Sequence, residues 1–449
     1  MIRKVLIANR GEIAVRIIRA CREMGIGTVA IYSEADREAL HTQLADTAIC
    51  IGPAPAIDSY LDMERIISAT IASGADAIHP GFGFLSENAK FVRLCEQCNI
   101  TFIGPPSDVI SRMGNKAEAR NTMVAAGVKV IPGSKEEVFD VERGKELARE
   151  ITYPIMIKAA LGGGGKGMRV AMEEEHFADA FLTAQKEAAI AFGDSTMYLE
   201  HFIENPRHIE FQILADAYGN TVYLGERDCT IQRNHQKMIE ESPSQVLTEV
   251  LRRKMGAEAV KAAKAAGYEN AGTVEFLLNQ DNQFYFMEMN TRIQVEHPVT
   301  EWVTGIDLIK EQVRIADKKP LSYRQEDITI TGHAIECRIN AEEPEKNFRP
   351  SPGMITNVYL PGGKGVRVDS AIYNGYEVPS YYDSMLAKLI VHAKNRKEAI
   401  TKMRSALGEV IIEGVHTNVD YLYDLINKEE FEKGDYDINF IDRLRGDTV

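Results

Sequence analysis

The sequence predicts a multidomain protein that combines an α/β unit with α+β units. Its 449 residues exceed what one ordinary hydrophobic core holds, so roughly two to four domains are expected. An apolar strand over residues 3–8, helical spacing over 12–23 and a second strand over 28–32 form an N-terminal βαβ pattern. After Pro320, alternating and glycine-punctuated strands indicate a β-rich C-terminal unit.

The composition is that of a globular protein, with 45% hydrophobic and 26% charged residues. No apolar run approaches the ~18–20 residues that a membrane span needs, and no signal peptide is evident, so we expect a cytoplasmic protein. The formal net charge of −14 argues against nucleic acid as a partner. The single C-x-x-C pair, Cys95 and Cys98, is expected to be two semi-buried thiols rather than a redox or zinc site.

Residues 1–113 are expected to form the N-terminal α/β domain. The turn Asn9-Arg10-Gly11 after the first strand has one glycine where a dinucleotide fingerprint needs three, which excludes a Rossmann NAD site there. The glycine-rich passage 79–88 follows a strand, and loops at such sheet ends commonly face ligands.

A second glycine-rich stretch lies between two strands, over residues 154–159 and 168–171. Because a strand follows the run Gly162–Gly165, and Lys166 is followed by glycine, the stretch is not a Walker A loop. Its backbone N–H groups suit phosphates, and its freedom suits a lid. The alternative interpretation is a plain flexible turn.

Polar residues alternate with apolar residues along the strand 206–215, so His208, Glu210 and Gln212 share one face. The following span, 226–241, gathers cations, an imidazole and amides. The alternative interpretation is a charged surface loop. A helix over 248–266 leads to the next strand pair.

A β-hairpin is predicted over residues 273–289, with its turn at 279–282. The expected register places Glu275 opposite Phe286 and diagonal to Glu288, on one face with Asn290. These oxygen donors favour Mg²⁺ or Mn²⁺ over zinc. The alternative is a solvated hairpin face with scattered charges.

The chemistry is expected in the stretch 286–298, which concentrates acids, an amide, a cation and an imidazole directly after the second hairpin strand. Further along the chain, the alternating strand 328–339 places Glu336 and Arg338 on one face.

The strings IANRGEIA, HPGFGFLSEN, ERDCTIQRNHQK, EMNTRIQVEHPVTE and GHAIECRINAE, together with the glycine-rich lid, resemble the biotin carboxylases of the ATP-grasp superfamily. The resemblance covers essentially the whole chain. It implies an ATP-grasp fold with an N-terminal βαβ domain over 1–113, an ATP-grasp domain over 114–320 whose mobile lid covers about 130–203, and a C-terminal domain over 321–449.

The resemblance also implies roles for individual residues. The positions that match contacts to ATP are Lys116, Lys158, Gly164, Gly165, Glu200, His201, Phe202, Ile203, His208, Gln232, His235 and Ile438. Glu275, Glu288 and Asn290 match the metal positions. Lys237, Arg292, Gln294 and Val295 match the bicarbonate site, Glu296 the base, and Arg338 the contact to the biotin ureido oxygen.

The implied activity is that of a ligase that uses ATP, Mg²⁺ or Mn²⁺ and bicarbonate to carboxylate biotin on a biotin carboxyl carrier protein through carboxyphosphate. The chain ends after this module, which favours a free-standing subunit that acts with carboxyltransferase subunits in the first half-reaction of acetyl-CoA carboxylase, in fatty acid synthesis. The alternatives are the subunit of another acyl-CoA or pyruvate carboxylase, another ATP-grasp ligase, or a regulatory nucleotide-binding subunit.

Some positions depart from the family pattern. Leu161 interrupts the glycine run, Lys166 stands where arginine is common, and Phe82 stands where tyrosine is frequent. Lys364 occupies an often aromatic position of the subunit contact, while Arg19, Glu23 and Arg367 match that contact and imply a homodimer.

Overall fold

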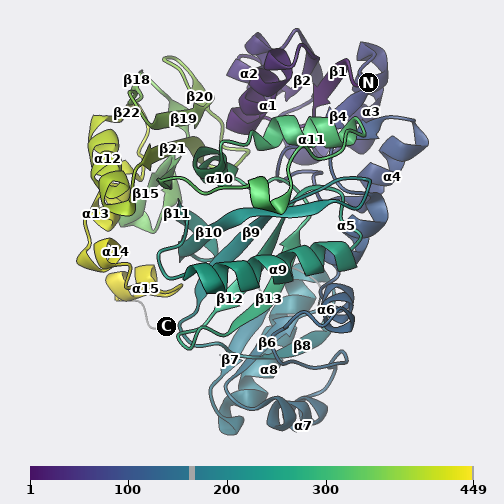
Figure 1. Ribbon diagram of the computed structural model, residues 1–449, viewed down its shortest axis with the longest axis vertical. Coiled ribbons are helices and arrows are strands. Elements are labelled where there is room, and N and C mark those ends of the chain that lie inside the picture. Colours follow the sequence, from purple (N-terminus) through teal and green to yellow (C-terminus); the bar gives the residue numbers. More distant parts are fainter. Residues whose placement is uncertain (161–166, 447–449) are drawn as a thin grey trace.

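The computed structural model describes residues 1–160 and 167–446. Its N-terminal part is a parallel five-stranded sheet in the order β3-β2-β1-β4-β5, with helices on both faces (Figure 1). Its elements are β1 (Lys4–Ile7), α1 (Gly11–Glu23), β2 (Gly27–Ser33), α2 (Leu40–Leu44), β3 (Thr47–Gly52), α3 (Met63–Ser73), β4 (Ala77–His79), α4 (Ala89–Gln97), β5 (Thr101–Phe102) and α5 (Ser107–Gly114).

The βαβ prediction is confirmed at α1. The helix starts directly after the sheet because Gly11 takes a left-handed φ of 66°, which a residue without a Cβ adopts without strain. Its apolar side chains at helical spacing, among them Ile13, Ile17 and Ile18, are buried against the sheet. Along α3, Asp62 caps the first turn and Gly74 ends the helix in the left-handed region.

The lid forms a small separate layer at the bottom of Figure 1. Its antiparallel sheet has the order β7-β6-β8, and it has its own apolar core with Phe177 and Phe181 at the centre. Its elements are α7 (Val141–Ile151), β6 (Ile155–Ala159), β7 (Met168–Ala171), α8 (Glu174–Phe192) and β8 (Met197–His201), and the preceding helix α6 (Lys116–Ala125) packs in the core of the central sheet. The predicted strands on either side of the glycine run are therefore present, while residues 161–166, including Gly164, Gly165 and Lys166, lie outside the described residues.

An eight-stranded sheet forms the middle of the molecule, in the order β13-β12-β9-β10-β11-β14-β21-β19. Its first five strands come from the centre of the sequence, and the last three come from the C-terminal part. The central elements are β9 (Arg207–Ala215), β10 (Thr221–Arg233), β11 (Gln236–Ser242), α9 (Glu249–Ala265), β12 (Asn270–Leu278), β13 (Phe284–Asn290), α10 (His297–Thr304) and α11 (Leu308–Ala316).

The C-terminal part adds short strands and a group of helices around a second core that contains Leu389, Met403 and Phe431. Its elements are β14 (His333–Asn340), β15 (Glu342–Glu343), β16 (Arg349–Pro350), β17 (Gly353–Met354), β18 (Asn357–Tyr359), β19 (Val366–Ser370), β20 (Glu377–Val378), β21 (Met385–Ala393), α12 (Arg396–Glu409), β22 (Ile411–Glu413), α13 (Val419–Ile426), α14 (Glu429–Lys433) and α15 (Phe440–Arg445). Among the described residues, none of the helices is both long and apolar enough to span a bilayer.

Candidate active site

One face of the central sheet carries a row of buried charged and polar side chains. Glu210 on β9 lies directly between Arg227 on β10 and Glu275 on β12 in the strand register. His208 and Gln212 share its face, as the alternating pattern predicts. The opposite face packs on the apolar core beneath α9, so this row lies on the face that carries α10 and the segment before it.

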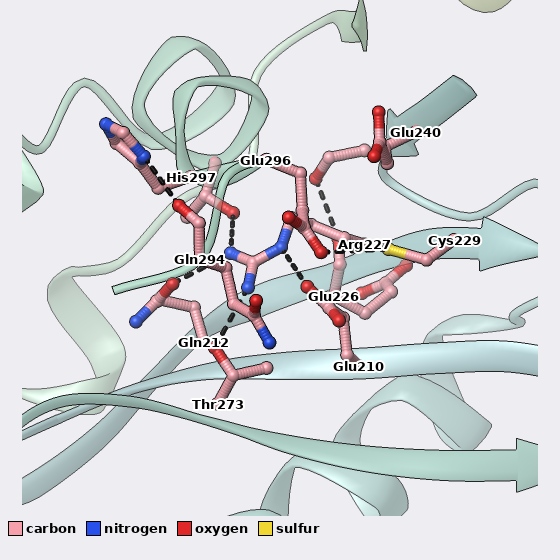
Figure 2. Close-up of polar contacts among 12 residues, drawn as sticks. Glu210, Gln212, Glu226, Arg227, Cys229, Glu240, Thr273, Gln294, Glu296 and His297 are labelled. Atoms are coloured by element: carbon pink, nitrogen blue, oxygen red, sulfur yellow. Dashed lines mark hydrogen bonds and ion pairs between the residues drawn. The ribbon is translucent and has the colours of Figure 1, made fainter. Parts of the chain in front are cut away.

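Arg227 ties this face together, although its side chain is completely buried (Figure 2). Its guanidinium donates to Glu210, to Gln212 Oε1 at 2.8 Å, to Thr300 Oγ1 at 2.9 Å and to Thr273 Oγ1 at 3.0 Å. A buried cation is stable only when its donors are paired in this way. Arg227 therefore fixes three strands relative to α10, and the sequence analysis assigned it no role.

The Lys237 ammonium lies at the meeting point of three carboxylates. Its Nζ is 2.5 Å from Glu210 Oε2, 2.7 Å from Glu296 Oε1 and 3.1 Å from Glu275 Oε1. Burial opposes the charge of Lys237, but these carboxylates outweigh burial and raise its pKa well above its ordinary value. Lys237 is therefore a permanent cation beside the predicted base.

Glu296 is fully buried and is held by two cations. Besides Lys237, Arg338 donates from Nη2 to Glu296 Oε2 at 2.9 Å, and its Nε donates to Glu240 Oε1 at 2.6 Å. Burial alone would raise the pKa of Glu296, whereas Lys237 and Arg338 hold it well below its usual range. Glu296 is thus an ionised carboxylate at neutral pH, while burial raises the pKa of Glu240 to about 7.

Arg292 forms the outer wall of the same space. Its Nε donates to Glu87 Oε2 at 2.8 Å and its Nη1 to Gln294 Oε1 at 2.7 Å. Glu87 also accepts from the Thr291 backbone N–H at 3.0 Å. The glycine-rich passage 79–88 therefore does reach the site, as its position after a strand predicted, and Glu87 holds Arg292 in place.

The hairpin register differs from the prediction. Glu275 lies directly opposite Glu288, and Phe276 lies opposite Phe286. The expected pairing of Glu275 with Phe286 is wrong because the turn closes on the pair Asn279–Gln283 and a β-bulge after Glu275 adds one more residue of offset. The two carboxylates are consequently closer neighbours than the diagonal register implied.

The oxygen donors of the hairpin have unequal environments. Glu275 is buried and accepts from Asn290 Nδ2 at 2.7 Å and Gln294 Nε2 at 3.0 Å, and its other oxygen is 2.7 Å from His208 Nε2. Burial would raise the pKa of Glu275, but Lys237 and His208 outweigh burial and hold it well below its ordinary value. Glu288 is exposed on the same face. Two opposed carboxylates, one fixed and one accessible, fit a hard divalent cation such as Mg²⁺.

Of the residues predicted for nucleotide binding, Gly164 and Gly165 lie outside the described residues, and the others come from the lid, the central sheet and the C-terminal part. Lys158 on β6 pairs with Glu200 on β8, and both precede the connector through Ile203. A cavity of about 610 Å³ lies beside Lys116, between α6 and the lid. Among the remaining positions, His201 ends β8 and Phe202 follows it, Gln232 is near the end of β10, and His235 is in the β10–β11 turn. The Ile438 N–H donates to Pro206 O at 3.1 Å.

Sequence reasoning missed three residues that hold the site: Glu87, Arg227 and Glu240. Glu240 lies on the face of Arg338 in the pairing of β11 with β14. Arg227 is five residues from Gln232, so alternation alone would put the two on opposite faces, and the register shifts in β10 break the pattern between them. Glu87 gave no such signal, because its partner Arg292 lies 205 residues away.

Three family sequence models match the chain. They are described as the biotin carboxylase N-terminal domain, over residues 1–110, the ATP-binding domain of the carbamoyl-phosphate synthase L chain, over 115–324, and the biotin carboxylase C-terminal domain, over 336–443. Biotin carboxylase 1 of Bacillus subtilis is 58% identical over 98% of both chains.

This chain belongs to the biotin carboxylase family.

Solved structures agree with this assignment. Biotin carboxylase of Campylobacter jejuni in a β,γ-ATP complex is 50% identical over 99% of both chains, with a TM-score of 0.95. The biotin carboxylase domain dimer of Hydrogenobacter thermophilus 2-oxoglutarate carboxylase, in complex with MgADP, ADP and bicarbonate, is 50% identical over 100% of this chain and 99% of that one, also with a TM-score of 0.95. The ATP-grasp fold and the ligase class expected from the sequence are therefore confirmed.

Proposed function

We propose that this enzyme carboxylates biotin on a carrier protein in two steps, and that the residues around Lys237 and Glu296 carry both. The observation that supports this most directly is the joint placement of an ionised buried carboxylate, Glu296, between Lys237 and Arg338. The biotin carboxylase domain of Hydrogenobacter thermophilus 2-oxoglutarate carboxylase was solved in complex with MgADP, ADP and bicarbonate. We propose the same substrates here, with ATP as the phosphoryl donor.

ATP is proposed to lie between the sheet and the lid. Lys116, Lys158 and His208 would contact its phosphates or ribose, together with Gly164 and Gly165 of the lid, and residues 200–203, Gln232, His235 and Ile438 would border the adenine and ribose. Glu275 and Glu288, with Asn290 beside them, would hold Mg²⁺ or Mn²⁺, because they combine opposed hard oxygen donors with one accessible position. The metal ion, when bound, neutralises phosphate charge.

Bicarbonate is proposed to bind at Arg292, Gln294, Val295 and Lys237. A bicarbonate oxygen attacks the γ-phosphorus of ATP, its proton passes to Glu296, and ADP leaves, which gives carboxyphosphate. Bicarbonate is itself an anion, so it would form ion pairs with Lys237 and Arg292. Lys237 would then stabilise the ionised form of Glu296 less strongly. That change raises the basicity of Glu296 at the moment when a base is needed.

Biotin is proposed to approach Arg338. Its ureido nitrogen is a poor nucleophile until it loses a proton, and the resulting charge is delocalised onto the ureido oxygen. A charge-assisted hydrogen bond from Arg338 stabilises that oxygen. The proton of the nitrogen passes to the phosphate group of carboxyphosphate, the C–O bond to that phosphate breaks, and the nitrogen bonds to the carboxyl carbon as hydrogen phosphate leaves.

The biological setting proposed is the first half-reaction of acetyl-CoA carboxylase, in fatty acid synthesis, with a biotin carboxyl carrier protein and carboxyltransferase subunits as partners. The names of relatives such as B. subtilis biotin carboxylase 1 support it. The relative from 2-oxoglutarate carboxylase favours, as a second candidate, the same half-reaction for another acceptor. A homodimer is proposed, as in that relative, and so is the three-domain division at about residues 113 and 320.

Phosphate release from ATP, measured with and without bicarbonate and free biotin, tests the proposal. We expect hydrolysis that requires bicarbonate and accelerates with biotin, with carboxybiotin as a product. Another ATP-grasp ligase would hydrolyse ATP without responding to biotin, and a regulatory subunit would not turn over ATP at all.

A further inference from the structure

A completely buried lysine lies behind the bicarbonate segment and has no role in the proposal above. Lys388 on β21 is directly opposite Arg338 on β14, and its side chain is 0% exposed. Its Nζ donates to the Val295 backbone oxygen at 2.9 Å. The nearest carboxylates are those of Glu12, at 3.1 Å, and Asp369, at 3.9 Å.

The contact with Val295 places Lys388 under the peptide that carries the reactive groups. Gln294 precedes Val295 and Glu296 follows it, and α10 begins at the next residue. On the side facing the substrate space, Lys237 and Arg338 hold Glu296, and Glu275 holds Gln294. The Val295 carbonyl is held by Lys388, which leaves the sheet on the same face as Arg338. The segment has no regular secondary structure of its own between β13 and α10, so these side-chain bonds determine its position.

The counter-charge comes from the other end of the sequence. Glu12 is the second residue of α1, and its side chain is 3% exposed. A lysine without solvent needs an adjacent carboxylate to stay charged, and a charged ammonium is a stronger donor to a carbonyl than a neutral amine. This gives a structural reason for the glutamate in the string IANRGEIA, which directly follows the turn Asn9-Arg10-Gly11.

We propose that Lys388 is a positioning residue for the bicarbonate segment, with Glu12 as its counter-charge. The inference rests on the bicarbonate role proposed above for residues 294–296. Lys388 touches no substrate. It acts by fixing the peptide from which the Gln294 side chain, the Val295 N–H and the Glu296 carboxylate reach the substrate.

Four variants separate positioning from a structural role. Lys388→Met keeps the length of the side chain and removes the donor. Lys388→Met combined with Glu12→Gln also removes the stranded carboxylate, so this double variant keeps the fold. Glu12→Gln alone removes the negative charge but keeps an oxygen atom that can accept a hydrogen bond from Lys388. Arg10→Met is the matched control, because it removes a cation from another buried pair, with Asp36, that does not touch the segment.

Bicarbonate-dependent ATP hydrolysis without biotin, at varied bicarbonate and varied ATP, is measured for each variant together with its melting temperature. Both Lys388→Met proteins should show a KM for bicarbonate raised at least about tenfold, since small misplacements of reacting groups have large effects. The KM for ATP should stay within about twofold of wild type, because the nucleotide residues are held independently. Glu12→Gln removes the counter-charge and should raise the KM for bicarbonate less than Lys388→Met does, because Lys388 can still donate to the Val295 oxygen. Arg10→Met should lower only the melting temperature.

A folded double variant with an unchanged KM for bicarbonate would overturn the proposal. So would a parallel rise of both KM values, which is the result expected of general loosening. The wild-type protein separates this inference from the function on which it rests. Wild-type hydrolysis that ignores bicarbonate would overturn both, whereas bicarbonate-dependent wild-type hydrolysis with a normal double variant would overturn the positioning role alone.

Discussion

Glu275 and Glu288 face each other across the hairpin but differ in freedom. Glu275 is engaged by His208, Asn290 and Lys237, while Glu288 is exposed. Replacing Glu288 by glutamine removes one negative charge and keeps the shape, so the Mg²⁺ concentration for half-maximal activity should rise and turnover should fall. Activity titrated with Mg²⁺ measures this. Asp281→Asn, at the exposed hairpin turn, is the control, and equal Mg²⁺ titrations of the two variants would refute the metal assignment.

Glu296 and Arg338 touch each other yet are expected to act in different half-reactions. Glu296→Ala should abolish both bicarbonate-dependent ATP hydrolysis and carboxybiotin formation, because bicarbonate keeps its proton. Arg338→Ala should retain part of the hydrolysis and lose carboxybiotin by a hundredfold or more, since an oxyanion contact is worth roughly 3–4 kcal/mol.

Phosphate and carboxybiotin must be quantified separately on both variants. The contact of Arg338 with Glu296, at 2.9 Å, adds a smaller expectation: without Arg338 the pKa of Glu296 moves up toward its usual range. If the Arg338 variant loses both products equally, its role is not confined to biotin.

At the scale of elements, the pairing of β11 with β14 concentrates acids inside the sheet. Glu240 lies opposite Glu336, both are fully buried, and the groups facing Glu240 are Arg338, Glu296 and Lys237. Burial raises the pKa of Glu240 from 4.5 to about 7, so the folded protein binds this proton more tightly than the unfolded chain. The resulting stabilisation is complete below pH 4.5 and is lost as the pH rises through about 7.

Glu240→Gln removes this titration. Relative to wild type, the variant should gain stability at pH 8 and gain less at pH 5, by a difference on the order of 1–3 kcal/mol. Chemical denaturation at the two pH values measures the difference. Glu258→Gln on α9, whose carboxylate is partly exposed beside Lys261, is the control and should show little difference between the two pH values. A Glu240 variant that matches this control would mean that the buried acid is not titrating in this range.

At the scale of the molecule, the central sheet joins strands from two of the three predicted domains, so the site is built across them (Figure 1). The proposed subunit contact lies elsewhere, at Arg19, Glu23 and Arg367. Arg19 is exposed on α1. Because a two-fold contact contains every substitution twice, Arg19→Glu should weaken the dimer by roughly tenfold or more.

Sedimentation at several protein concentrations measures the dimer dissociation constant. Arg93→Glu is the matched control, because Arg93 is an exposed arginine on α4. A dimer that tolerates Arg19→Glu as well as it tolerates Arg93→Glu would place the subunit contact on another surface.

Local sequence patterns predict the order and the type of the main helices and strands. Apolar periodicity located α1, β9 and β14, and the strands on both sides of the glycine run followed from the same rule. The sequence also predicts the chemistry of the site, because a motif such as EMNTRIQVEHPVTE keeps several candidate side chains within one short segment. These features depend on residues a few positions apart, whose interactions repeat with the period of the helix or strand.

The contacts between segments far apart in the sequence depend on the complete fold. The bulge after Glu275 moved Glu288 directly opposite it, and no local pattern encodes that offset. Glu87 reached Arg292 across 205 residues, and Lys388 reached Val295 across 93. A buried ion pair has no periodic signature, because its partners are selected by the whole path of the chain and by the need to pair every charge that folding removes from water.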